Sequence, residues 1–269
     1  MRIKTGILGF DELVGRGFPE GSSVLVCGKI GTGKSIFTRQ YLVRGITDYG
    51  DLGVLVSLER GKRDLYHDAL AFGWHIQRLE KEGTLQILGG PISSVSREMG
   101  KAKGKTEDFI SEVVEVVETS ESRRVAFERI DLLSMFSPDE SELKVQLSRL
   151  RESLAKLGCT SVLTSEIREG REELSGLGAE GILDGVIVLY YEGEGLTRDR
   201  ALEIRKMRGT EHSNRLHFFN IIENKGIVIE KIPGERVEKI PRESNREDTD
   251  IVKIQQMVDE QRKRLGNPK

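Results

Sequence analysis

The chain contains 269 residues, and its 42 Lys and Arg residues against 44 Asp and Glu residues give a formal net charge of −2 at pH 7. This balance excludes a strongly basic protein that binds nucleic acid through a general excess of positive charge, and the length fits one large domain with an appendage or two small domains. No apolar run reaches the ~18 residues of a membrane span and the N-terminus lacks an apolar leader, so we expect a cytoplasmic protein without a membrane segment.

Short apolar strands alternate with amphipathic helices through the first two thirds of the chain, which indicates βαβ units around a mostly parallel sheet. The expected strands are Ser23–Cys27, Gly53–Leu58, Thr84–Leu88, Arg124–Phe127, Thr160–Thr164 and Gly185–Tyr191. The expected helices begin near Lys34, Arg63, Glu107 and Ser141. Cys27 and Cys159 are too few for a disulfide framework, and we interpret both as buried strand cysteines.

The pattern changes after Tyr191, where shorter apolar segments are separated by Gly and Asn turns. They are Ala201–Met207, Arg215–Ile222 and Gly226–Ile232, and they predict an antiparallel extension of the sheet. Residues 1–233 then form one domain, because the charged segment 234–269 has too little apolar content to fold alone. In this tail a weak helical stripe, Ile251, Ile254, Val258 and Leu265, suits either a frayed surface helix or one that docks on a neighbour.

One segment matches the phosphate-binding pattern G-x-x-x-x-G-K-[ST] without a mismatch, directly after an apolar strand and at the start of a helix. It comprises Gly28, Lys29, Ile30, Gly31, Thr32, Gly33, Lys34 and Ser35, and we add Ile36 to the predicted nucleotide-binding residues. Backbone N–H groups at a helix N-terminus favour phosphate, the lysine reaches the terminal phosphates and the serine hydroxyl ligates Mg²⁺. The sequence therefore predicts a nucleotide site that uses Mg²⁺.

Beyond this loop, the chain contains an ordered series of characteristic segments. They are Thr5–Leu13, Gly53–Glu59, Leu163–Glu166, Asp184–Leu189 and Lys206–His212. With this series the sequence resembles the KaiC-like ATPases of the RecA superfamily over most of Thr5 to Ile232. The resemblance implies a single RecA-like P-loop domain with helices on both faces of the sheet, Mg²⁺ with ATP as the ligand, and homo-oligomers, most often hexamers. Nothing in the sequence separates ATP from GTP, but the resemblance favours ATP.

Glu59 follows an expected strand, at the edge of the sheet where α/β proteins place their chemistry. In the family, a glutamate at this place is the base that polarises the attacking water. Many relatives carry two acids in a row, whereas Arg60 follows here. This departure could slow hydrolysis or alter how the base is tuned.

Glu128 lies where the family has an Asp-Ser pair whose acid holds Mg²⁺ through water. Glutamate keeps the charge but reaches about 1.5 Å farther, and Arg129 beside it could neutralise part of that charge. Asp131 could compensate, yet on a continuing strand it would point to the same side as Arg129. We therefore assign the metal to Ser35 and Glu128, and we expect a weak ATPase.

Lys206, Arg208 and His212 belong to the Lys-Met-Arg-Gly-Thr-Glu-His segment. On a strand, residues two apart share one face, so the lysine and arginine lie together. In RecA-like rings the matching residues reach the γ-phosphate of the adjacent subunit, as an arginine finger supplied in trans. The resemblance therefore implies that assembly and hydrolysis are coupled.

Binding to DNA is possible but not favoured, because the two segments that would face DNA in RecA relatives are net acidic. Ser134–Glu142 contains three acidic residues and no Lys or Arg, and in Glu166–Glu180 five glutamates face two arginines. The lysine-rich loop from Pro91 to Thr106 keeps this alternative open. The leading hypothesis is a slow ATPase that acts on protein partners. The alternatives are a nucleotide sensor without turnover and a recombinase paralogue that binds single-stranded DNA.

Overall fold

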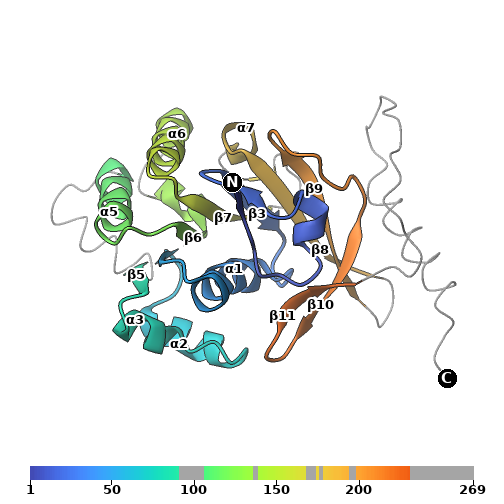
Figure 1. The fold of residues 1–269 in the computed structure, drawn as a ribbon. Helices are drawn as coiled ribbons and strands as arrows, with labels where there is room; N and C mark the ends of the chain where they lie inside the picture. Colours follow the sequence, from blue (N-terminus) through green and yellow to red (C-terminus); the bar gives the residue numbers. More distant parts are fainter. Residues whose placement is uncertain (91–105, 136–138, 168–173, 176–177, 194–197, 231–269) are drawn as a thin grey trace, which may run out of the picture.

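Nine strands form one sheet at the centre of the protein, in the order β11-β10-β9-β8-β3-β7-β6-β4-β5 (Figure 1). The computed structural model describes residues 1–90, 106–135, 139–167, 174–175, 178–193 and 198–230. The strands are β3 (Ser23–Gly28), β4 (Gly53–Ser57), β5 (Leu85–Gly89), β6 (Arg124–Glu128), β7 (Thr160–Glu166), β8 (Gly185–Glu192), β9 (Asp199–Met207), β10 (His217–Ile222) and β11 (Gly226–Ile229). The six strands β3 to β8 pair in parallel, while β9, β10 and β11 are antiparallel. The predicted α/β class and antiparallel extension are confirmed.

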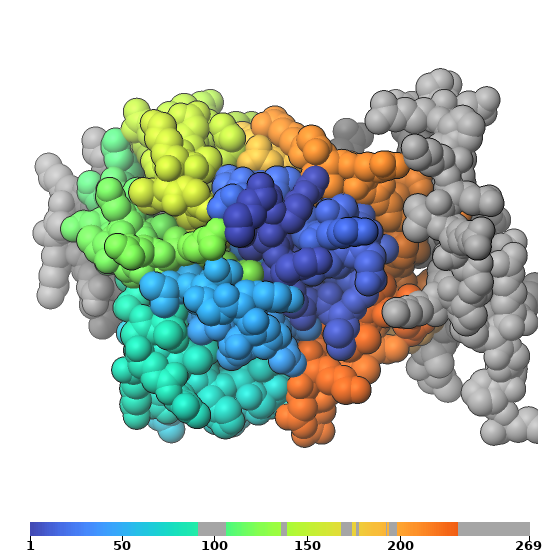
Figure 2. Space-filling model, in the orientation of Figure 1, coloured from blue at the N-terminus to red at the C-terminus, as the bar shows by residue number. Residues whose placement is uncertain are grey.

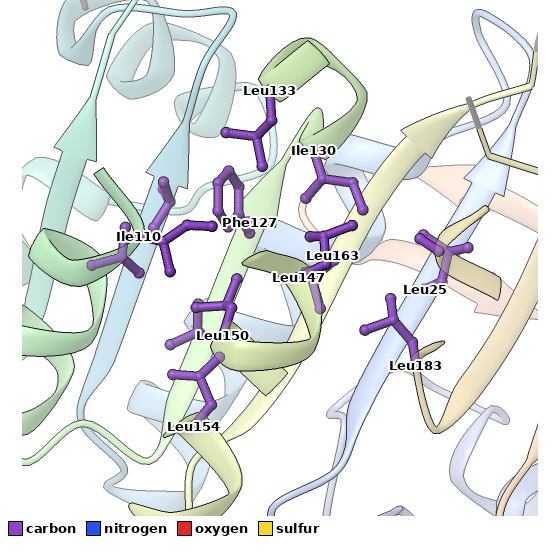
Figure 3. Close-up of a cluster of buried hydrophobic side chains, with 14 of the residues drawn as sticks. Leu25, Ile110, Phe127, Ile130, Leu133, Leu147, Leu150, Leu154, Leu163 and Leu183 are labelled. Carbon is purple, nitrogen blue, oxygen red and sulfur yellow. The ribbon is translucent and has the colours of Figure 1, made fainter. Parts of the chain in front are cut away.

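Helices cover both faces of this sheet, consistent with the burial of every residue of β3, β4 and β6. They are α1 (Lys34–Tyr49), α2 (Lys62–Leu70), α3 (Ile76–Lys81), α5 (Thr106–Thr119), α6 (Glu140–Lys156) and the single turn α7 (Ala179–Ile182). On β3, Leu25 and Cys27 pack with the α5, α6 and α7 side, whereas Val24 and Val26 pack with the α1 side. Figure 3 shows the first of these clusters, in which leucines of α6 meet Phe127 and Leu163.

The N-terminal segment joins the C-terminal strands on the α1 face. Short strands β1 (Arg2–Ile3) and β2 (Phe18–Pro19) pair with each other, and a single 3-10 turn, η1 (Asp11–Val14), lies between them. Leu8 forms an isolated bridge with Val228, and the Ile229 amide donates to the Leu8 carbonyl over 2.9 Å. The dark blue and orange surfaces are accordingly adjacent in Figure 2. The start of the chain thus helps to fix the antiparallel end of the sheet.

Two local predictions differ from the structure. The strand of Glu128 does not continue, because Arg129 has a φ of 65° and the 3-10 turn η2 (Ile130–Met135) follows at once. Cys159 is buried but immediately precedes β7, whereas Cys27 is a buried strand cysteine as predicted. Helix α3 was not anticipated, because six residues show too little periodicity to be recognised.

Several predictions lie wholly or partly outside the described residues. They concern the lysine-rich loop at 91–105, parts of the two acidic segments at 136–138, 168–173 and 176–177, and the tail from 231 to 269. The boundary near Pro233 therefore stays a prediction. Within the part of the chain that the structure describes, no helix has the length and apolar character needed to cross a membrane.

Candidate functional site

The phosphate loop connects the buried strand β3 to the N-terminus of α1, as the motif predicts. Gly31 and Gly33 adopt φ angles of 81° and 105°, which side chains disfavour, so glycine lets the loop wrap tightly. A Cβ on Gly28 would lie 2.5 Å from the Leu189 carbonyl oxygen of the neighbouring strand. No side chain caps the N-terminus of α1, and its first amides remain available to an anion.

Lys34 is the first residue of α1 and folds back over the loop. Its Nζ donates to the carbonyl oxygens of Gly28 and Lys29 over 2.7 and 2.8 Å. Burial lowers the pKa of this ammonium, and the nearby Glu166 carboxylate opposes that shift. The geometry places the positive charge at the mouth of the loop, where a phosphate would bind.

Glu59 lies just beyond β4, at the same sheet edge as the phosphate loop. Its side chain is 45% exposed, and its Oε1 accepts from Nη1 of Arg129 over 3.3 Å. Nη2 of the same arginine contacts Asp131 over 2.9 Å and Glu166 over 3.2 Å. Three carboxylates from the ends of β4, β6 and β7 thus converge on one guanidinium.

Glu128 lies at the end of β6 but points into the protein, where its side chain is 1% exposed. Its Oε1 accepts from Nε of Arg39 over 2.9 Å, and its Oε2 accepts from Nη2 over 3.1 Å. Thr38 adds a contact from its hydroxyl over 3.3 Å. Burial by itself would lower the pKa of Arg39, but the Glu128 and Asp68 carboxylates together outweigh this effect and raise it.

The predicted metal ligands fit Mg²⁺ unequally. The Ser35 hydroxyl lies in the first turn of α1, where a nucleotide-bound ion would meet it. The Glu128 carboxylate does not fit in this arrangement, because Arg39 satisfies both of its oxygens and balances its charge. The described residues contain no cluster of three or more His, Cys, Asp or Glu that could hold a metal, so phosphates and water would supply most ligands of Mg²⁺.

Lys206 and Arg208 lie near the N-terminal ends of the parallel strands, whereas the phosphate loop follows the C-terminal end of β3. Met207 between them pairs with Gly185 at the start of β8, and Gly185 in turn pairs with Val24. Gly28 is four residues further along β3, which corresponds to about 13 Å at the usual rise of a strand. Neither cation is therefore close to the phosphate loop of its own chain.

The two cations do share one side, as predicted, and both contact the α7 region. Nζ of Lys206 donates to the Glu180 and Leu183 carbonyl oxygens over 3.0 and 2.6 Å. Arg208 is 53% exposed and pairs with Asp184 over 3.3 Å. His212 is half-buried, and its Nδ1 lies 2.9 Å from the Ser213 carbonyl oxygen.

Three arginines of the site escaped the sequence reasoning or received no positive role in it. Arg39 has the spacing of an ordinary helix residue, and Arg129 was considered only as a neutralising neighbour. Arg200 of β9 contacts the Gly31 carbonyl through Nη2 over 3.4 Å and lies 4.0 Å from the Tyr191 ring centroid. The contacts of Arg39 with Glu128, of Arg129 with Glu59 and of Arg200 with Gly31 join residues distant in sequence, and no local pattern signals them.

The parallel sheet, the loop after β3 and the carboxylates at the same edge define a RecA-like P-loop protein. Residues 3–234 match the family described as "ATPase: KaiC". The chain therefore belongs to the KaiC family of ATPases, with one KaiC domain, and the family is one of ATP-binding proteins. The predicted resemblance is confirmed.

Known proteins of similar sequence support this assignment. The UPF0273 protein MJ1359 of Methanocaldococcus jannaschii is 35% identical over 236 residues, covering 85% of this chain and 96% of that protein. The circadian clock oscillator protein KaiC of Synechococcus elongatus is 31% identical over 258 residues, and the chain spans 49% of its length. The crystal structure of the KaiC-like protein PH0186 from Pyrococcus horikoshii OT3 shares 35% identity and a TM-score of 0.75, covering 86% of this chain and 99% of that one.

Proposed function

We propose that the chain binds ATP with Mg²⁺ and hydrolyses it slowly at a site that a second copy of the chain completes. The observation that carries this proposal is that the two groups of proposed catalytic residues lie far apart within one chain. The phosphate loop and Glu59 lie at the C-terminal ends of the parallel strands, and Lys206 and Arg208 lie near the N-terminal ends. One chain cannot bring both sets to the same phosphate, but two chains joined head to tail can.

In this mechanism Lys34 and the amides of the loop hold the phosphates. Glu59 orients the attacking water, because its exposed carboxylate lies at the edge next to the loop. Lys206 and Arg208 of the neighbour leave the carbonyl oxygens and Asp184 that they contact here, and they stabilise the charge that develops on the γ-phosphate. A finger of this kind contributes about 10³ to 10⁵ in rate in other phosphoryl-transfer proteins. His212, whose Nδ1 contacts the Ser213 carbonyl oxygen here, stays a predicted third residue of this finger.

Mg²⁺ bound to ATP would neutralise charge on the phosphates, and Ser35 is the residue of this chain that we propose to ligate it. The metal role of Glu128 stays a prediction, because it requires the pair with Arg39 to open. The pairing of Glu128 with Arg39 is consistent with slow turnover, because Arg39 occupies the carboxylate that would otherwise help to hold Mg²⁺. We propose a cytoplasmic hexamer whose nucleotide state is recognised by protein partners.

A complementation experiment tests the shared site. Lys34→Ala removes ATP binding but keeps the finger, whereas Arg208→Ala keeps the phosphate loop but lacks the finger. We expect each variant alone to release almost no phosphate and an equal mixture to recover activity. Random mixing makes roughly a quarter of the interfaces competent, because each interface takes its loop from one chain and its finger from the next.

The control replaces the first partner by the Lys34→Ala/Arg208→Ala double variant, which cannot supply a finger and should restore nothing. Failure of the mixture to recover any activity, although Arg208→Ala alone is inactive, would contradict a shared site. Light scattering gives an independent test, because we expect Mg·ATP to shift the molar mass towards a hexamer. A chain that stays monomeric with and without Mg·ATP would refute the assembly proposal.

A nucleotide sensor without turnover is the second candidate, and the two acid–arginine pairs favour it. Arg129 holds Glu59, and Arg39 holds Glu128, so neither acid is free in the structure. A phosphate-release assay that compares the wild type with Lys34→Ala and Glu59→Gln separates the two functions. Tight ATP binding with no release above the Lys34→Ala background would favour the sensor.

A further inference from the structure

Arg129 has an unusual backbone conformation at the edge of the proposed site. Its φ of 65° lies in the left-handed region that residues other than glycine rarely adopt. The conformation ends β6 and starts the turn η2, and the Arg129 amide donates to the Thr164 hydroxyl over 2.9 Å. The surrounding contacts therefore hold Arg129 in a backbone conformation that is unfavourable for an arginine by itself.

The guanidinium is anchored on its inner side. Nε donates to both oxygens of Asp131 over 3.1 and 3.2 Å, and Nη2 donates to Oδ2 over 2.9 Å. Asp131 is itself fixed, since it is 3% exposed and also accepts from the Glu166 amide over 3.4 Å. Nη2 further pairs with the Glu166 carboxylate over 3.2 Å. Arginine suits this role because its planar fork can bind one carboxylate with two nitrogens and still present a third.

The third nitrogen, Nη1, faces Glu59 over 3.3 Å. The two partners differ in freedom: the arginine side chain is 20% exposed and tied to two acids, whereas the glutamate is 45% exposed. An exposed glutamate has several rotamers of similar energy. The fixed guanidinium therefore selects one position for the Glu59 carboxylate.

We propose that Arg129 is a positioning residue, which Asp131 and Glu166 hold in place so that it orients the Glu59 carboxylate at the phosphate-loop edge of the sheet. The inference rests on the proposed function, in which Glu59 orients the attacking water. It gives Arg129, the residue after Glu128, a role in catalysis that it exerts through the side chain of Glu59. A displacement of about 1 Å in a reacting group can lower a rate 100-fold, so the expected effect is large.

The test is a double-mutant cycle between Arg129→Ala and Glu59→Gln, read by single-turnover phosphate release and by the Kd for ATP. In the wild-type background we expect Arg129→Ala to lower the rate about 10- to 100-fold while the Kd for ATP changes less than about twofold. In the Glu59→Gln background the same substitution should cause no further loss. Arg129→Lys, which keeps the charge but not the fork, should restore only part of the rate.

Two further variants complete the design. Asp131→Asn removes the charge and one acceptor oxygen of the inner anchor without changing the arginine itself, and we expect it to reproduce the loss of rate in an otherwise folded protein. It keeps the test informative where Arg129→Ala fails to fold. Arg60→Ala is the matched control, because it removes an arginine next to Glu59 that makes no contact with its carboxylate among the described interactions. We expect its rate to equal that of the wild type.

The outcomes separate this inference from the function on which it rests. An unchanged rate in Arg129→Ala, or an equal loss in both backgrounds, would overturn the positioning role while Glu59 keeps its own. A large rise in the Kd for ATP would instead mean that Arg129 binds the nucleotide directly, which also overturns it. A wild type that releases no phosphate, or a Glu59→Gln variant with the wild-type rate, would refute the proposed function and this inference with it.

Discussion

The pair of Glu128 and Arg39 is the interaction whose loss we expect to destabilise the protein most clearly. Glu128→Gln keeps the size of the side chain but removes the charge that balances Arg39, whose side chain is 8% exposed. Breaking a buried ion pair from one side costs about 3–5 kcal/mol, because the other charge stays buried without compensation. Asp68 lies 3.4 Å from Nη1 of Arg39 and can take up part of that charge, so we expect about 3 kcal/mol.

For a domain of this size, a loss of about 3 kcal/mol corresponds to a fall in Tm of roughly 6–12 °C. Urea unfolding followed by circular dichroism measures the change directly through the midpoint and slope. Glu112→Gln, on the exposed face of α5, is the control and should stay within about 0.5 kcal/mol of the wild type.

The double variant Arg39→Met/Glu128→Leu sharpens the test. Replacing both partners by apolar residues removes the buried charges together, and it should be more stable than Glu128→Gln alone. Stability of Glu128→Gln within about 0.5 kcal/mol of the wild type would refute the reasoning, since a carboxylate so enclosed cannot be lost without cost unless water or a metal reaches it.

Three further predictions concern packing, thiols and nucleic acid. Gly45→Ala should lower the urea midpoint, because the new Cβ would lie 2.1 Å from Nε of Arg124, a side chain that is 1% exposed. Alanine has the higher helix propensity, so a raised midpoint would contradict this reasoning. Burial raises the pKa of Cys27 and of Cys159 to about 12, so neither thiol should react with Ellman's reagent at pH 8 in the native protein, and both should react in denaturant. Fluorescence anisotropy with a single-stranded oligonucleotide at two salt concentrations should show no strong salt-sensitive binding; such binding would support the recombinase alternative.

The local parts of this protein could be predicted from the sequence because they depend on neighbouring residues. The phosphate loop, the start of α1 at Lys34 and the strands on either side follow from glycine spacing and apolar runs. The order of the segments also indicated the family. These signals lie within a few residues of one another, so one sequence is enough to detect them.

The contacts of the site could not be predicted in the same way. Arg39 and Glu128 are 89 residues apart in the chain, and an arginine within a helix usually indicates a solvated side chain. The left-handed turn at Arg129 was equally hidden, because glycine or asparagine normally marks this conformation. The argument against Asp131 as a metal ligand therefore loses its premise, because it assumed a strand that continues past Glu128.

The placement of Lys206 and Arg208 near the N-terminal ends of the parallel strands, away from the phosphate loop, has a kinetic consequence. Because a lone chain lacks half of the proposed catalytic groups, its turnover per molecule would depend on how many other copies surround it. Dilution would then reduce the specific activity, and the rate would rise with a power of protein concentration greater than one until the assembly is complete. In a cell, the abundance of the protein would decide how much ATP each copy consumes.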